Sequence, residues 1–245
     1  MEVTFRQDEH RRLQAQNTEL ATLAGGLAHE IRNPLSTIGM NLELLAEELE
    51  GDDTARARRM QKRITNLQAE CRNLEDVLNA FLQFAKAGEL DLGAGNLNDV
   101  VTEYADFLEA QAESLGVELR LHLDSNLPSV MIDRSLMRQV LVNLGRNALQ
   151  AMPGGGAIDF LTHVQNRKIV LEIIDTGHGM DEKTLSRMFQ AFFSTRSGGS
   201  GLGLPTVRRI VESHHGQILC ESEPGKGTRF TILLPPAGDF DAAPQ

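Results

Sequence analysis

Ala28-His29-Glu30-Ile31-Arg32-Asn33-Pro34-Leu35 lies inside a stretch whose leucines and isoleucines recur every three or four residues, and this spacing decides how the first part of the chain folds. His29 is two residues from both Leu27 and Ile31, so on a helix it points away from the apolar stripe. Pro34 offers no N–H to the carbonyl of Glu30 and should bend the helix one turn after His29. The stripe has the period of one amphipathic helix ending near residue 49 and comprises Leu20, Leu23, Leu27, Ile31, Leu35, Ile38, Leu42, Leu45 and Leu49.

The residues beside His29 favour a reactive histidine. Glu30 supplies a neighbouring carboxylate, and Asn33 lies one helical turn further on, at i+4 from His29. An exposed imidazole, a carboxylate and a locally loosened helix suit a nucleophile. The octet alone equally permits a surface histidine next to a kink, because short motifs produce false matches.

The string from His29 to Leu35 resembles the phosphoacceptor box of two-component sensor histidine kinases. This resemblance implies that His29 carries the phosphoryl group and that Glu30 acts as its base. It also implies that Asn33 positions a water that removes phosphate from a partner regulator. The alternative for Asn33 is that it satisfies backbone groups freed by Pro34.

Composition excludes several classes of function. The 245 residues carry a formal net charge of −10, which argues against a nucleic-acid-binding surface. We expect no membrane segment, because no apolar run approaches the roughly 18 residues that span a bilayer, and no secretory signal at the start. The two cysteines, Cys71 and Cys220, fit neither metal nor redox spacing. They indicate buried thiols in a reducing cytoplasm.

A second helix follows a turn at residues 51–54, with an Asp or Thr as its cap. Two helices joined by a short turn form an antiparallel hairpin, and an apolar seam along the hairpin stays half covered until a second hairpin packs on it. We therefore expect a homodimer with a four-helix bundle. The seam alternates steps of four and three, as heptads do, through Met60, Ile64, Leu67, Cys71, Leu74, Leu78 and Phe81.

The whole chain divides into five parts. Residues 1–22 are polar with leucines seven apart, which is typical of a coiled-coil lead-in. Residues 23–87 form the helical hairpin, and the glycines of 88–96 indicate a linker. Residues 97–236 have a mixed α/β pattern of alternating strands and amphipathic helices, and the Pro/Ala/Gly/Asp tail at 237–245 is expected to be disordered.

Two segments of the α/β part carry polar side chains where a ligand could meet them. Asn143 and Asn147 are i,i+4 on one helix face, and amide oxygens suit Mg²⁺, although both could instead be satisfied by neighbouring backbone. Asp175 ends an apolar strand and is followed by Gly177 and Gly179, which places a carboxylate acceptor at the mouth of a pocket. The amino group of adenine is a natural donor to it.

Two further segments are rich in glycine. Gly201-Leu202-Gly203 leads into a helix start, where close backbone approach and exposed N–H groups favour polyphosphate. It is neither a P-loop nor a Rossmann fingerprint. Residues 225–228, ending at Thr228, lie between two strands and on their own indicate no more than a hairpin turn.

In this order, the four segments resemble the N, G1, G2 and G3 boxes of the Bergerat-type ATPase domain of histidine kinases, and residues 189–196 match its aromatic box and the start of its ATP lid. The resemblance implies an α/β-sandwich that binds ATP and Mg²⁺. One departure is Gln150, because many family members have a basic residue at this position. In this chain Arg146 or Arg196 could supply that charge instead. The implied roles are metal binding by Asn147 with Asn143 beside it, adenine recognition by Asp175, Gly177, Gly179 and Thr228, and phosphate contact by Gly201, Leu202, Gly203 and Arg196.

The resulting hypothesis is an ATP-dependent protein-histidine autokinase that passes its phosphoryl group to an aspartate on a response-regulator receiver domain. Removal of phosphate from that regulator would be a second activity. The alternative is a catalytically silent dimeric scaffold that binds nucleotide as a conformational switch.

Overall fold

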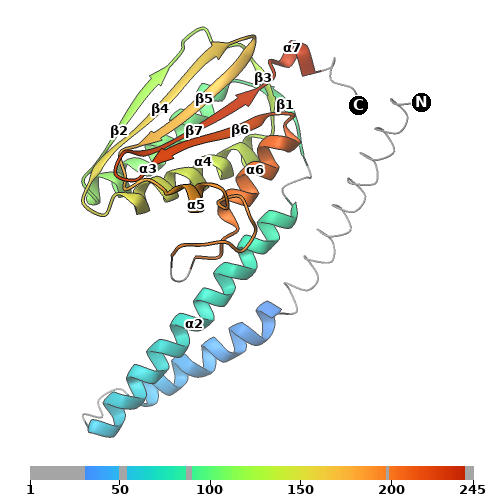
Figure 1. The fold of residues 1–245 in the computed structure, drawn as a ribbon. Helices are drawn as coiled ribbons and strands as arrows, with labels where there is room; N and C mark the ends of the chain where they lie inside the picture. The colour runs from blue at the N-terminus through green and yellow to red at the C-terminus, as the bar shows by residue number, and fades with distance from the viewer. Residues whose placement is uncertain (1–30, 50–53, 87–89, 197–198, 241–245) are drawn as a thin grey trace. The chain divides into compact units, whose positions relative to one another are not determined.

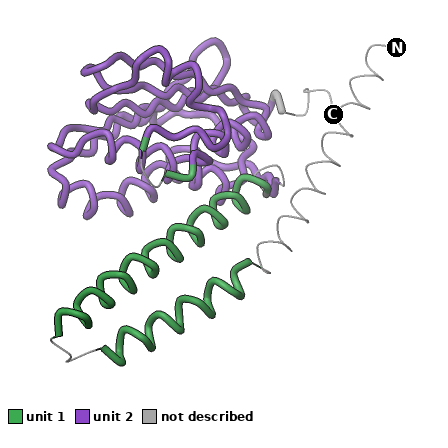
Figure 2. The backbone as a smooth tube through the Cα atoms, turned by 60° about the horizontal axis from the view of Figure 1, so that its bottom comes forward, with its two compact units in different colours: residues 1–86, 196–200 green, residues 87–195, 201–245 purple. Residues whose placement is uncertain are grey.

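The computed structural model describes residues 31–49, 54–86, 90–196 and 199–240. They form two compact units, the first comprising the described residues up to 86 with 196 and 199–200, and the second the described residues 90–195 and 201–240 (Figure 2). The first unit contains a helix over residues 31–48 and a second helix, α2 (Ala55–Lys86). The expected lead-in at 1–22 lies outside the described residues. Pro34 lies within the helix over residues 31–48, and the stretch before residue 31, against which a bend at Pro34 would be judged, is also outside the described residues.

The two helices pack as the antiparallel hairpin that the sequence predicts. Thr54 caps the start of α2, because its hydroxyl accepts a hydrogen bond from the N–H of Ala57 at 3.1 Å. Arg32 bridges the helices by donating to Asn79 at 2.8 Å. The residues buried in this unit include Leu35, Leu42, Ile64 and Leu78. Other apolar residues of the stripe and of the seam stay about half exposed, namely Ile31, Ile38, Leu45, Leu67 and Leu74.

The second unit is a two-layer α/β domain (Figure 1). Its five-stranded sheet has the order β2-β4-β5-β7-β6, in which β2 and β4 are parallel and the other neighbours antiparallel. The strands are β2 (Val117–Leu123), β4 (Gly156–Gln165), β5 (Lys168–Asp175), β6 (Gln217–Glu223) and β7 (Gly227–Leu234). Three helices cover one face of the sheet: α3 (Leu97–Ser114), α4 (Arg134–Ala151) and α6 (Gly203–Ser213).

The core lies between these two layers. Alternate strand residues such as Ile158, Phe160 and Leu171 are fully buried against Leu141 and Leu144 of α4. This is the alternation that a half-buried strand requires, since successive side chains point to opposite faces. No helix in the described part of the chain combines the length and apolarity needed to cross a bilayer.

Two boundaries differ from the sequence-based expectation. The last part of the expected linker forms β1 (Gly93–Gly95), which pairs with β3 (Val130–Ile132). The expected disordered tail begins with a turn of helix, α7 (Ala237–Phe240). In both cases the backbone is paired despite the composition of the segment: β1 bonds β3, and the N–H of Ala237 donates to the carbonyl of Ser129 at 2.8 Å. A further single turn of helix, α5 (Glu182–Leu185), follows β5.

Candidate nucleotide site and phosphoacceptor helix

Helix α4 carries the two asparagines on the side that faces α6. Asp133 caps α4 by accepting from the N–H of Leu136 at 3.0 Å, which fixes where the helix begins. Asn143 and Asn147 are both partly exposed. Gly203, the first residue of α6, lies so close to Asn143 that a Cβ added there would be 3.4 Å from the amide oxygen. The fold therefore brings the first and third sequence segments together.

Asp175 is the last residue of β5, and its side chain is held in place by the turn that follows. Only 6% of it is exposed, and its Oδ1 accepts from the N–H of Gly177 at 2.9 Å. Thr228 is its partner in register on β7, and the hydroxyls of Thr228 and Ser222 are 3.0 Å apart. The second and fourth segments thus meet at one end of the sheet, with Ser222 as a polar neighbour that sequence reasoning missed.

The backbone at this end of the sheet is packed too closely for side chains. Gly179 and Gly227 have φ values of 65° and 83°, the left-handed region that favours glycine. A Cβ on Gly179 would collide with the carbonyl of Glu223, and one on Gly227 with the carbonyl of Asp175. These glycines are therefore required by the fold itself, whether or not they touch a ligand.

The glycine-rich segment before α6 packs against the aromatic box at residues 189–196. The N–H of Phe192 donates to the carbonyl of Gly201 at 3.0 Å, and both residues have positive φ. A Cβ on Gly201 would lie 2.5 Å from the backbone of Phe192. Leu202 is 1% exposed, so its side chain belongs to the core, and only its backbone can serve the ligand contact expected of it. The N-cap residue of α6, Leu202, makes no side-chain capping hydrogen bond at this helix N-terminus, where an anion is favoured.

The phosphoacceptor box is described only in part. His29 and Glu30 lie outside the described residues. Asn33 is exposed on the helix over residues 31–48, and its carbonyl accepts from the hydroxyl of Thr37 at 3.1 Å. Arg196 is exposed and immediately precedes residues 197–198, which the structure does not describe, so its contact with phosphate stays a prediction.

His214, which belongs to none of the motifs identified from the sequence, is fully buried at the end of α6. Its Nδ1 is 2.7 Å from the carbonyl of Ile210, and its Nε2 is 2.9 Å from the N–H of Asp133. The carbonyl requires a donor and the N–H an acceptor, so the imidazole is neutral with its proton on Nδ1. Burial lowers the pKa of His214, while the bond to Ile210 opposes this shift. The sequence feature that indicates burial of His214 is the apolar stripe Val207, Ile210 and Val211, because His214 continues this stripe at helical spacing.

The residues on the nucleotide side fit ATP and magnesium. A buried carboxylate stands at the end of a strand, and glycines pack closely around it. The described residues contain no group of three His, Cys, Asp or Glu side chains that could hold a metal. Magnesium commonly uses few protein ligands together with phosphates and water, so the amides of α4 are a suitable anchor.

Two family models match the chain. The "His Kinase A (phospho-acceptor) domain" covers residues 19–90, and the "Histidine kinase-, DNA gyrase B-, and HSP90-like ATPase" covers residues 132–238. The second match begins at β3, although α3 and β2 share the same hydrophobic core. The structure therefore extends the ATPase domain toward the N-terminus beyond the matched residues.

Individual proteins agree with these models. Sporulation kinase E of Bacillus subtilis is 33% identical over 238 residues, 96% of this chain and 31% of that protein. The sensor histidine kinase ZraS of Escherichia coli is 34% identical over 231 residues, 94% of this chain and 48% of that protein. Among solved structures, full-length ShkA in complex with AMPPNP matches with a TM-score of 0.69 and 28% identity over 88% of this chain and 46% of that one. ThkA in complex with the response regulator TrrA matches with a TM-score of 0.66 and 25% identity over 96% of this chain and 67% of that one.

The chain therefore belongs to the two-component sensor histidine kinases, with a phosphoacceptor helical domain followed by an ATP-binding domain. It spans between 31% and 48% of the length of the two curated relatives described above.

Proposed function

We propose that this protein is an ATP-dependent protein-histidine autokinase. The observation that carries the proposal is the presence, in one chain, of a phosphoacceptor domain containing His29 and an ATPase domain whose four nucleotide segments converge in pairs. An ATPase domain alone supports nucleotide binding. The helical domain supplies the acceptor that makes phosphoryl transfer within the protein the favoured function.

In the proposed reaction, a ring nitrogen of His29 attacks the γ-phosphorus of ATP. The new N–P bond forms as the bond between that phosphorus and the β,γ-bridging oxygen breaks, and ADP leaves. Glu30 accepts the proton from the imidazole or orients it. The phosphoryl group then moves from His29 to a carboxylate oxygen of an aspartate on a response-regulator receiver domain. The complex of ThkA with its regulator supports this second partner by analogy.

The proposed nucleotide contacts follow the grouping of residues in the second unit. The carboxylate of Asp175 accepts from the adenine amino group, with Gly177, Gly179 and Thr228 around the base. The start of α6 at Gly201 and Gly203 meets the phosphates. Arg196, which is grouped with the first unit, is proposed as a further phosphate contact on the family resemblance alone. Asn147, with Asn143 beside it, holds Mg²⁺, which when bound neutralises charge on the phosphates.

A homodimer is the proposed assembly, because a second hairpin would cover the apolar stripe that the first leaves half exposed. Leu67 and Leu74 are each 53% exposed, and Ile38 is 49% exposed. Leu67 and Leu74 are one heptad apart on α2, and Ile38 is one heptad from Ile31 and Leu45 on the first helix, which is the spacing of a coiled-coil seam. A four-helix bundle would bury them.

We further propose that the protein works in the cytoplasm and dephosphorylates its regulator. Free Cys71 and Cys220 are typical of a reducing compartment. The exposed amide of Asn33 could hold a water in line with a phospho-aspartate, since an amide both donates and accepts. The hydrogen bond from Thr37 is to the backbone carbonyl of Asn33, so a mutation of the side chain tests the proposed role without removing that bond.

Incubation of the full chain with γ-³²P-labelled ATP and Mg²⁺ tests the proposed function against the silent scaffold. An autokinase becomes labelled, and the label moves to a purified receiver domain. A scaffold binds nucleotide, as calorimetry would show, yet stays unlabelled. Nucleotide binding without label would therefore overturn the proposal in favour of the scaffold.

A further inference from the structure

Helices α3 and α4 run in the same direction and are joined at their N-terminal ends by charge. Arg134 of α4 donates to Glu103 of α3 at 2.7 Å and lies 4.0 Å from Asp99. One turn further on, the guanidinium of Arg138 lies 5.5 Å from the ring centroid of Phe107. Arg134 and Arg138 thus each have a partner on α3, along the first half of the helix pair.

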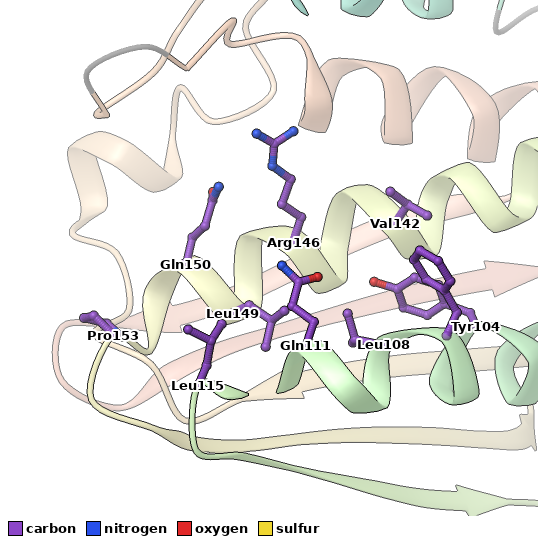
Figure 3. Close-up of a pocket in the computed structure, with 10 residues that line it drawn as sticks. Tyr104, Leu108, Gln111, Leu115, Val142, Arg146, Leu149, Gln150 and Pro153 are labelled. Carbon is purple, nitrogen blue, oxygen red and sulfur yellow. The ribbon is translucent and has the colours of Figure 1, made fainter. Parts of the chain in front are cut away.

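The second half of the same helix pair opens into a groove of about 500 Å³ (Figure 3). Its rim carries large apolar side chains that water can reach: Phe107 is 63% exposed, Leu115 43% and Val142 38%. Among the described residues that line the groove, Arg146 is the only charged one. Unlike Arg134, it makes no hydrogen bond or ion pair with any residue that the structure describes.

The floor of the groove is a buried tyrosine with an unused hydroxyl. Tyr104 is 2% exposed, and its hydroxyl points into the groove without a hydrogen-bond partner among the described residues (Figure 3). Gly145 makes room for it, since any Cβ at that position would collide with the hydroxyl oxygen. Burial raises the pKa of Tyr104 to about 12, so the hydroxyl keeps its proton and can donate. Because this hydroxyl lines the groove, an acceptor bound in the groove can take its hydrogen bond.

We propose that this groove docks an amphipathic helix of a partner protein that brings an acidic side chain to Arg146 and Tyr104. Both groups are donors, and a carboxylate accepts from both. From Phe107 to Leu115 the groove follows α3 for about 12 Å, two turns of helix, which matches apolar anchors at i, i+4 and i+7. Exposed aromatic and arginine side chains around a pocket are the residue types that dominate protein interfaces.

The charge of the groove supports an acidic partner in particular. The chain as a whole carries a net charge of −10, yet the described lining of the groove includes the cation Arg146 and no carboxylate. A small organic acid would satisfy the donors but leave Phe107 and Val142 at the rim in water. A helix covers both the donors and the rim. The proposal does not require autokinase activity, because it rests on the shape and charge of the groove between α3 and α4, although Arg146 is also one of the two residues that could supply the basic charge missing at Gln150.

The chain offers a reporter for this groove, since Tyr104 is its only tyrosine and it has no tryptophan. The experiment titrates the full chain with a 15-residue fluorescein-labelled helical peptide that lacks Tyr and Trp and carries leucines at i, i+4 and i+7 with two flanking glutamates. A matched peptide has lysines in place of the glutamates. Tyr104 fluorescence and peptide polarisation are recorded together, and decanoate forms a third arm.

We expect saturable binding of the glutamate peptide that changes Tyr104 fluorescence. Arg146→Glu and the lysine peptide should each weaken binding at least tenfold, and Phe107→Glu should abolish it. Val164→Glu, on an exposed valine of β4, is the matched control and should bind as the wild type does. Polarisation that rises without a change in Tyr104 fluorescence, equal binding of the lysine peptide, no binding of the glutamate peptide, or a response to decanoate alone would each overturn the proposal.

Discussion

The Asp175 carboxylate provides the sharpest test of how this domain would recognise a base. Asp175→Asn is nearly isosteric, and the Asn oxygen can still accept the 2.9 Å bond from the N–H of Gly177, so the fold should be kept. The side chain is 6% exposed, which means that water cannot replace a lost partner. A hydrogen bond to a charged group contributes about 1.5–3 kcal/mol. At about 1.4 kcal/mol per factor of ten, ATP should bind roughly 10- to 150-fold more weakly.

The same substitution should change which base is preferred. The Asn amide nitrogen donates, so it meets the adenine amino group as donor against donor, whereas the carbonyl of inosine triphosphate is an acceptor that it can satisfy. Calorimetric titration of wild type and variant with the magnesium complexes of both nucleotides gives the ratio of the two affinities. The ratio should move toward inosine triphosphate in the variant. An unchanged ratio in a variant with the wild-type melting temperature would refute the proposed adenine contact.

Three further predictions concern other parts of the molecule. Because burial lowers the pKa of His214, the unfolded chain binds the proton more readily, so the free energy of unfolding should be full above about pH 6.5 and fall below it by up to about 1.4 kcal/mol per pH unit. Urea unfolding at several pH values should show this slope, and His214→Phe should remove it. The same variant should lose about 1–3 kcal/mol of stability at neutral pH, because the N–H of Asp133 is left without an acceptor. Leu74→Asp should convert the dimer to monomer in sedimentation experiments, because it buries an unpaired charge in the bundle, while Ala69→Asp on the opposite side of α2 should leave the dimer intact. Asn33→Ala should keep autophosphorylation but lose at least tenfold in dephosphorylation of the regulator, and a parallel fall of both rates, or no change in either, would favour the purely structural role.

Helical and strand periodicity predicted most of the fold because burial follows the repeat of each element. The stripe through Leu35 and Leu42 and the alternation through Phe160 are local consequences of a single period. β1 was missed because its Gly-Ala-Gly sequence has no apolar pattern, and its pairing with β3 is a long-range contact. Glycine composition indicated a flexible linker there, whereas backbone hydrogen bonds decided the outcome.

The candidate site was accessible from sequence where side chains carry a motif and inaccessible where tertiary packing acts. Asp175 and Gly177 are neighbours in the sequence, so their turn could be expected. The role of Ser222 depends on the register of β6 against β7, and that of His214 on a residue 81 positions away. The α3–α4 groove has no sequence signature at all, because Gly145 has meaning only once Tyr104 lies against it.

The most direct test of the account is the chemistry of the label that γ-³²P-ATP leaves on the protein. Wild type should acquire label that is lost in acid and kept in base, as a phosphoramidate is, and His29→Gln should acquire none while its Mg-ATP affinity and dimer mass stay unchanged. Label that survives acid, or full labelling of His29→Gln, would contradict the assignment of His29 as the phosphoacceptor.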